Sequence, residues 1–114
     1  MSNKAIHWSG VFPAVSTQFR SDYSLDLDAT HAVMKNLVKD GVSGLGVCGS
    51  VGENTSLSTD EKLQIIEVAK DAAGGKIPVI AGVAEFTTAF AQKMAKEAER
   101  VGVDGIMVMP ALVY

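Results

Sequence analysis

Hydrophobic positions follow two patterns along the chain: short, nearly continuous apolar runs, and longer segments with helical spacing. The apolar runs cover residues 11–15, 45–48, 77–81 and 105–109, and their length and composition predict strands. The segments between them repeat apolar residues with the spacing that is typical of amphipathic helices. The pattern therefore predicts the element order β-α-β-α-β-α-β.

Each predicted helix has a recognisable start and end. The second has the clearest start, because Ser58 is followed three residues later by Glu61, which is the spacing of a capping box. Glycines stand just after the expected ends, where helices commonly stop. The predicted ranges are 26–39, 58–73 and 87–101. In the third helix, the residues expected to face inward are Phe90, Met94, Ala98 and Val101.

The spacing of the elements predicts a repeated βα unit. The apolar runs begin about 30 residues apart, which fits one strand, one helix and their connections. Segments 41–47 and 102–108 also share their glycines and apolar positions. Runs without polar alternation indicate strands that are buried on both faces, as in parallel sheets covered by helices. A β/α barrel and a doubly wound sheet both fit this pattern. Pro13 is expected to mark either the end of the first strand or a local break in it.

The length of the chain bears on this choice. A (β/α)8 TIM barrel needs about 250 residues, and the chain has 114. A complete doubly wound domain normally ends on a helix, whereas here the fourth apolar run is followed by only a few residues up to Tyr114. We therefore expect an α/β protein in which residues 1–114 form one partial domain, the N-terminal half of a (β/α)8 TIM barrel, and we expect the chain to be truncated.

Composition and charge argue against several classes of function. The net charge of −3 argues against nucleic-acid binding, which normally uses a basic surface. No apolar run approaches the roughly 20 residues of a membrane span, and the polar N-terminus lacks the apolar core of a secretory signal. The single cysteine suits a reducing, cytoplasmic compartment. No cluster of side chains has metal-ligand spacing, and we expect no cofactor.

The residues best placed for chemistry follow the second apolar run. They are Gly49, Ser50, Val51, Gly52 and Glu53. Ligands of β/α folds bind at the C-terminal ends of the strands, and two glycines allow backbone N–H groups to converge on an anion. Ser50 adds a hydroxyl that can donate, accept or relay a proton. A tight turn in which the glycines only satisfy geometry fits the same spacing, and the lack of a P-loop lysine argues against nucleotide binding.

Two carboxylates stand near this segment. Glu53 could act as a general acid or base, or could satisfy backbone donors beside the turn. Glu85 follows the third apolar run, at the same expected end of the sheet, where it could line the site or lie in solvent.

These residues resemble those of a known family. Segment 49–53, followed by residues 56–58 and Glu61, is similar to the signature of the dihydrodipicolinate synthase / N-acetylneuraminate lyase family. Segments 10–17, 77–83 and 105–110 resemble its first, third and fourth strands, so that the resemblance covers essentially the whole chain. The resemblance implies an eight-stranded barrel, usually a tetramer, in which a lysine forms a Schiff base with a 2-keto acid, typically pyruvate.

The resemblance also assigns roles to individual residues. Ser50 matches a catalytic hydroxyl residue that helps to bind the keto-acid carboxylate and relays protons, and Gly49, Val51 and Gly52 belong to the same substrate-binding turn. Val51 stands where well-known members carry a second hydroxyl, and Leu112 stands where synthases carry a tyrosine. These departures favour a relative that acts on another 2-keto acid or on a cyclic imine.

No lysine of the sequence fits the Schiff-base role. Such a lysine must lie inside the barrel, at the C-terminal end of a strand. The lysines here lie in the N-terminal tail, on predicted helices or, for Lys76, before a strand. The resemblance places the catalytic lysine on a later strand, so the 114 residues alone are expected to be inactive.

The sequence therefore predicts the N-terminal part of a Schiff-base-forming lyase or aldolase, with a 2-keto acid as substrate and a homo-oligomeric assembly. Within the family, a 2-keto-sugar-acid aldolase or dehydratase and a cyclic-imine deaminase are alternatives. Outside it, a complete doubly wound binding domain and a non-catalytic half-barrel that assembles with another chain are also open.

Overall fold

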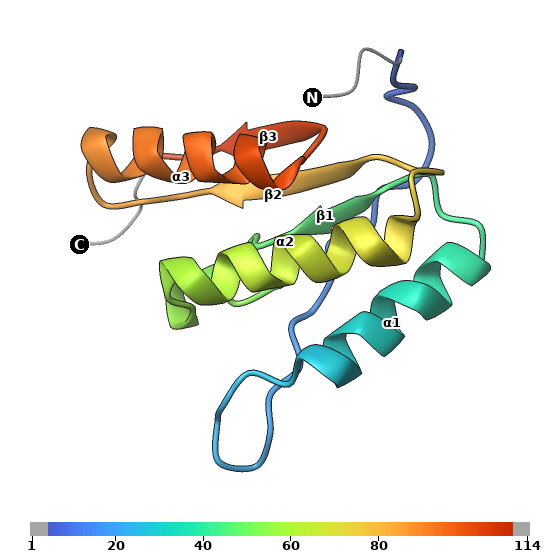
Figure 1. Ribbon diagram of the computed structural model, residues 1–114, viewed down its shortest axis with the longest axis horizontal. Helices are drawn as coiled ribbons and strands as arrows, with labels where there is room; N and C mark the ends of the chain where they lie inside the picture. Colours follow the sequence, from blue (N-terminus) through green and yellow to red (C-terminus); the bar gives the residue numbers. More distant parts are fainter. Residues whose placement is uncertain (1–4, 111–114) are drawn as a thin grey trace.

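The computed structural model describes residues 5–110, which contain a three-stranded parallel sheet with helices packed against it (Figure 1). The strands are β1 (Leu45–Val47), β2 (Val79–Val83) and β3 (Gly105–Val108), and their spatial order follows the chain. Strand β2 starts two residues later than the predicted run, because Pro78 has no N–H to donate to a neighbouring strand.

The three predicted helices are present, with small shifts of their ends. They are α1 (Leu27–Lys39), α2 (Thr59–Ala73) and α3 (Thr88–Val101), and a short 3₁₀ helix, η1 (Asn54–Ser56), precedes α2. Each α-helix follows a residue whose side chain accepts a hydrogen bond from an N–H of the first turn. Before α2, Ser58 and Glu61 form the complete capping box that the sequence predicts.

The strand predicted over residues 11–15 does not form, which corrects the expected order of four strands. The segment runs beside β1 but makes one isolated parallel bridge, between Ala14 and Gly46. Val15 N–H donates to the Gly46 carbonyl at 2.8 Å, and Gly46 N–H donates to the Pro13 carbonyl at 3.0 Å. The next donor along this ladder would be Pro13, which has no N–H, so the pairing ends there.

The helices bury one face of the sheet. Alternate strand residues face the hydrophobic core together with side chains from all three helices; these strand residues are Leu45, Val47, Val79, Ala81 and Val83. In α3, Met94 and Ala98 are buried as predicted, whereas Phe90 is 60% exposed. Figure 1 gives the reason: α3 begins beyond the tips of the strands, so that its first turn lies outside the core.

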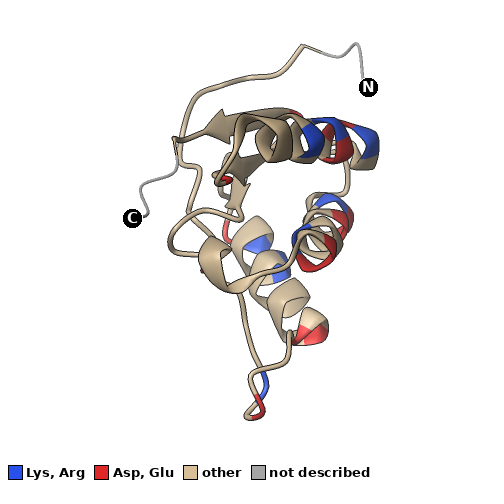
Figure 2. Ribbon diagram, turned by 90° about the vertical axis from the view of Figure 1, so that its left-hand side faces the viewer, with Lys and Arg blue, Asp and Glu red and all other residues tan. Residues whose placement is uncertain are grey.

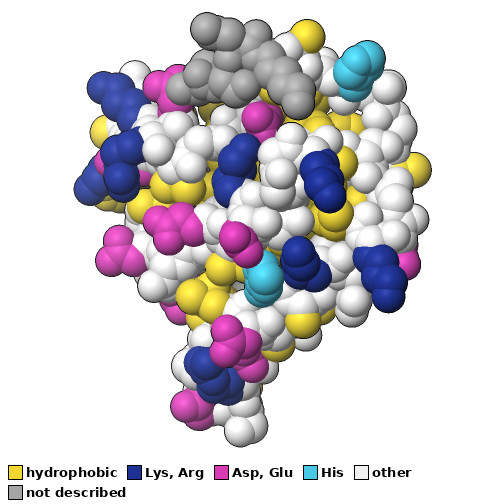
Figure 3. All heavy atoms as spheres, turned by 45° about the vertical axis from the view of Figure 1, so that its right-hand side comes forward, with side chains coloured by type: hydrophobic (Ala, Val, Ile, Leu, Met, Phe, Trp, Pro, Cys, Tyr) yellow, Lys and Arg dark blue, Asp and Glu magenta, His cyan; other side chains and the backbone are white. Residues whose placement is uncertain are grey.

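The other face of the sheet carries no helix in the described part of the chain (Figure 2). β3 is exposed on both faces: Ile106 and Val108, which are in register with the core-facing Ala81 and Val83, are exposed, and so is Met107 between them. The expected burial on both faces is therefore met only on the helix side of β1 and β2. Charged side chains lie on the helices and on loops, while the strands carry none (Figure 2). On the face shown in Figure 3, positive and negative side chains are interspersed. Between residues 5 and 110, no helix has the length and hydrophobicity to cross a membrane.

Candidate functional site

The chain turns sharply over residues 48–53, which we call the β1 turn. Its end residues, Cys48 and Glu53, have left-handed backbone conformations with φ of 59° and 57°, which is uncommon for residues that carry a side chain. Inside the turn, the N–H of Glu53 donates to the carbonyl of Ser50 at 3.0 Å. The turn lies at the C-terminal end of the sheet, where β/α proteins bind their ligands.

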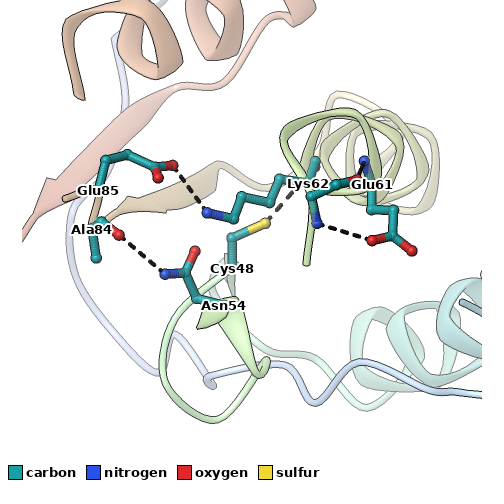
Figure 4. Close-up of polar contacts among 7 residues, drawn as sticks. Cys48, Asn54, Glu61, Lys62, Ala84 and Glu85 are labelled. Carbon is teal, nitrogen blue, oxygen red and sulfur yellow. Dashed lines mark hydrogen bonds and ion pairs between the residues drawn. The ribbon is translucent and has the colours of Figure 1, made fainter. Parts of the chain in front are cut away.

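Neighbouring segments hold the β1 turn from two sides. The buried hydroxyl of Thr17 donates to the carbonyl of Gly52 at 2.7 Å. After the turn, Asn54 Nδ2 donates to the carbonyl of Ala84 at 3.3 Å (Figure 4). Gly82 in β2 permits the β1 turn to lie close to β2, because a Cβ at this position would lie 2.5 Å from the carbonyl oxygen of Cys48.

A cavity of about 590 Å³ lies against the turn. Of the four residues predicted to bind substrate, Gly49, Ser50 and Val51 line the cavity, whereas Gly52 lies behind its wall. A Cβ on Gly52 would lie 3.1 Å from a backbone carbonyl oxygen of the N-terminal segment. The remaining lining is mostly apolar, and a mostly apolar cavity with a few polar groups is the usual form of a small-molecule site.

A partly buried ion pair forms part of the wall of this cavity (Figure 4). Lys62, near the start of α2, is only 4% exposed, and its Nζ lies 2.9 Å from Oε1 of Glu85, which follows β2. The carboxylate neutralises the ammonium within the wall, so the pair adds no net charge to the cavity. The contact also joins α2 to the loop after β2.

Two further polar groups lie beside the ion pair (Figure 4). Asn54 Oδ1 is buried and has no hydrogen-bond partner among the described residues. The Cys48 thiol donates weakly to the backbone carbonyl of Lys62 at 3.8 Å. Burial raises the pKa of Cys48 to about 12, an effect that Lys62 opposes and Glu85 reinforces. The thiol is therefore protonated at neutral pH and is a poor nucleophile.

The two carboxylates considered from the sequence have different surroundings. Glu53 is exposed, and its side chain makes no capping hydrogen bond at the start of η1. Glu85 is largely buried and lines the cavity, where it pairs with Lys62. Leu112, which the resemblance places in the proton relay, lies outside the described residues.

Sequence reasoning missed three polar residues that shape the site: Lys62, Thr17 and Asn54. A signal for Lys62 was available, because residues three, four and seven positions later are buried core residues of α2 and a helix places these on one face. Thr17 carried no comparable signal, because its contact spans 35 positions of the chain. Within residues 5–110, no group of three or more His, Cys, Asp or Glu residues could hold a metal ion.

Comparison with known protein families matches residues 7–113 to the dihydrodipicolinate synthetase family. The chain belongs to this family. A 4-hydroxy-tetrahydrodipicolinate synthase of Methanospirillum hungatei is 42% identical over 104 residues, which are 90% of this chain and 36% of the relative. An uncharacterised DapA-like lyase of Rhizobium meliloti is 42% identical over 103 residues, 90% of this chain and 34% of that protein. The chain thus spans about a third of the length of these family members.

Solved structures of the dihydrodipicolinate synthetase family share the fold. A putative dihydrodipicolinate synthetase from Pseudomonas aeruginosa has a TM-score of 0.87 at 30% identity, and the superposition covers 96% of this chain and 37% of the chain of that protein. YagE, a prophage protein of the family from E. coli K12 in complex with pyruvate, has a TM-score of 0.85 at 34% identity, and the match covers 93% of this chain and 36% of YagE. An N-acetylneuraminate lyase from Mycoplasma synoviae has a TM-score of 0.83 at 29% identity, and the match covers 92% of this chain and 37% of that lyase. The chain therefore has the fold of the first part of a TIM barrel, and the doubly wound alternative is wrong.

Proposed function

We propose that the chain forms the first part of the active site of a Schiff-base-forming lyase that acts on pyruvate or another 2-keto acid. The observation that carries this proposal is the position of the β1 turn, because Gly49, Ser50 and Val51 line an apolar cavity at the C-terminal end of β1. Membership of the family supports the lyase class. The complex of YagE with pyruvate supports the substrate class.

The β1 turn has the groups that a 2-keto acid requires. Backbone N–H groups of the turn can donate to the substrate carboxylate, and the Ser50 hydroxyl can donate a further hydrogen bond. The hydroxyl can then relay the proton that leaves or joins the substrate when the imine converts to an enamine. A bound substrate would displace water from the mostly apolar lining, which would strengthen each of these hydrogen bonds.

We place the imine-forming lysine outside these 114 residues, as the resemblance implies. Among the described residues, Lys62 is the one lysine that lines the cavity. Its ammonium is engaged by Glu85 at 2.9 Å, so an imine at Lys62 would require the buried ion pair to break. The remaining described lysines lie away from the cavity wall.

The altered relay positions favour a substrate other than that of the synthases. Val51 lines the cavity without the hydroxyl that the resemblance leads one to expect, and Leu112 replaces the expected tyrosine. A 2-keto-sugar-acid aldolase or dehydratase is the second candidate, which the similarity to an N-acetylneuraminate lyase supports. A cyclic-imine deaminase would fit the same change in the relay.

We propose a cytoplasmic homo-oligomer that needs no cofactor. Phe86 and Phe90, at the start of α3, are exposed apolar side chains, and such residues commonly mark protein contacts when they gather on a surface. The single cysteine is consistent with a reducing compartment.

Borohydride trapping tests the proposed reaction. The full-length protein and the 114-residue chain are each incubated with pyruvate and sodium borohydride, and the adduct is located by peptide mass mapping. We expect a reduced pyruvyl adduct in the full-length protein, on a lysine outside residues 1–114, and none on the short chain. An adduct on Lys62 would contradict the placement of the lysine. If neither pyruvate nor a larger 2-keto acid gives an adduct, the lyase function is wrong and a non-catalytic assembly role is favoured.

A further inference from the structure

Thr17 lies outside the sequence motif but contacts it directly. Its side chain is buried, and its Oγ1 donates to the carbonyl oxygen of Gly52 at 2.7 Å, which is the usual distance of a well-formed O–H···O hydrogen bond. Neither residue lines the cavity, so the bond holds the β1 turn from behind. A buried carbonyl that loses such a partner is left with an uncompensated desolvation cost.

The conformation of the turn depends on such restraints. Cys48 and Glu53 both have left-handed backbones, which persist in residues with side chains only where the surroundings hold them. Behind Gly52 the fit is close, because a Cβ there would lie 3.1 Å from the carbonyl oxygen of Val15. The N-terminal segment that includes Val15 and Thr17 is therefore the surface against which the turn is set.

We propose that Thr17 is a positioning residue for the β1 turn. Its hydroxyl fixes the Gly52 carbonyl, and thereby holds Ser50 and Val51 in the cavity lining. The other anchor, between Asn54 and Ala84, is longer and attaches one residue beyond the turn. Thr17 thus acts on the turn itself. The consequence for catalysis rests on the proposed function, whereas the consequence for the conformation of the turn does not.

Kinetics of the full-length protein test the catalytic consequence. Thr17→Val removes the hydroxyl at nearly constant volume, and Thr17→Ser retains it. We expect Thr17→Val to raise KM for the 2-keto acid about tenfold and to lower kcat/KM by roughly 10-fold to 100-fold, since small displacements of positioning groups have effects of this size. Thr17→Ser should restore KM to within about threefold of the wild type.

Asp104→Ala serves as the matched control. An Asp104 carboxylate oxygen accepts a hydrogen bond from the Val79 N–H at 2.8 Å, at the opposite end of the sheet. This variant therefore also leaves a main-chain group without its partner, and it removes the ion pair of Asp104 with Lys70 as well. It does not touch the turn, so KM should stay unchanged. If Thr17→Val does not fold, Thr17→Ala and Thr17→Ser form the comparison, since this pair also differs in the hydroxyl. An unchanged KM in the folded hydroxyl-free variant overturns the catalytic role.

Hydrogen exchange tests the positioning role independently of any reaction. The reporters are the amides of Glu53 and Asn54, which donate to the carbonyls of Ser50 and Gly49 within the turn. We expect the hydroxyl-free variant to exchange these two amides at least about tenfold faster than the wild type, relative to the amides of β2. Asp104→Ala should not produce this local change. If turn exchange is unaltered, Thr17 does not position the turn. If turn exchange rises as expected but no keto acid forms a trapped adduct, the positioning role stands and the proposed function fails.

Discussion

Ser50 and Glu53 stand three residues apart in the β1 turn but have different surroundings. Both residues are exposed, but Ser50 lines the cavity, whereas Glu53 lies outside its lining and has a left-handed backbone. A hydroxyl at the cavity wall can bind a substrate carboxylate and relay a proton. A carboxylate in solvent beside the turn is poorly placed for either task.

Substitution of these two residues should therefore have unequal effects in the full-length protein. We expect Ser50→Ala to lower kcat by about 10²-fold to 10⁴-fold, the usual effect of losing a proton-transfer group, and Glu53→Gln to lower it by less than about tenfold. Steady-state kinetics with the 2-keto acid identified by trapping provide the measurement. The reverse order would make Glu53 the chemical group and the turn purely structural.

Cys48 offers a test of burial beside the cavity. Its pKa is about 12 in the folded protein, against an ordinary value of 9.0. The thiol is therefore protonated in both states below pH 9, and its contribution to stability is lost as the pH rises from 9 toward 12, where only the unfolded chain ionises. At pH 8, iodoacetamide should not label Cys48 in the native full-length protein under conditions that label it completely in denaturant.

Peptide mass mapping follows the labelling of Cys48. The free energy of unfolding of the wild type, relative to Cys48→Ala, should also fall between pH 9 and pH 10.5. Rapid labelling of the native protein at pH 8 would show that the thiol is accessible and ionised, in disagreement with its burial.

At the scale of elements, the ion pair between Lys62 and Glu85 links α2 to the loop after β2. Removal of one partner leaves the other charge buried and unpaired, whereas replacement of both removes the cost as well as the attraction. We expect Lys62→Met to lower the free energy of unfolding by about 3 kcal/mol. The double variant Lys62→Met, Glu85→Gln should be more stable than Lys62→Met alone.

Urea denaturation of the full-length protein measures this difference. The single variant Glu85→Gln completes the set. If the losses of Lys62→Met and Glu85→Gln simply add in the double variant, the two charges do not interact in the folded protein.

Elements with local signals are the ones that the sequence predicts well. The capping residues of the three helices and the apolar period of α2 act over a few positions, and these helices form as expected. The strand at 11–15 fails because one proline removes the donor that its ladder needs. Phe90 has the inward helical spacing but is 60% exposed. It belongs to the first turn of α3, and α3 begins beyond the strand tips (Figure 1), which is a property of how the helix packs on the sheet.

The residues of the candidate site also differ in whether a local sequence pattern predicts them. The β1 turn is visible in the sequence because its glycines and Ser50 are contiguous. Thr17 and Asn54 reach the site through contacts with Gly52 and Ala84, 35 and 30 positions away. Such contacts depend on how strands and loops meet in three dimensions, so no local sequence pattern predicts them.

At the scale of the whole molecule, the described chain has an open sheet edge and an apolar surface beside it. Strand β3 is the last in the sheet order, and Ile106, Met107 and Val108 are exposed on it. Unpaired strand edges recruit other chains, and large exposed apolar patches are rare on soluble monomers. The 114-residue chain, prepared on its own, should therefore self-associate.

Size-exclusion chromatography with light scattering at tens of micromolar checks this expectation. A defined dimer would fit two half-barrels whose open strand edges pair with each other. Aggregation would also cover the open edges and the apolar surface, but without a defined arrangement. The matched control is Met107→Lys, which places a charge on the exposed strand and should shift the population toward monomer. A stable, well-folded 12 kDa monomer of the unmodified chain would contradict the expectation.

The order of the strands in space has a consequence for how the chain is made. Because β1, β2 and β3 lie side by side in the order of synthesis, each strand emerging from a ribosome meets the strand that was completed just before it. Within residues 5–110, each of the three strands pairs with its neighbour in sequence, and each loop to be closed between them spans only about one βα unit. The sheet can therefore grow from its N-terminal side as translation proceeds, and each added helix covers the face of the newest strand pair before the next one arrives.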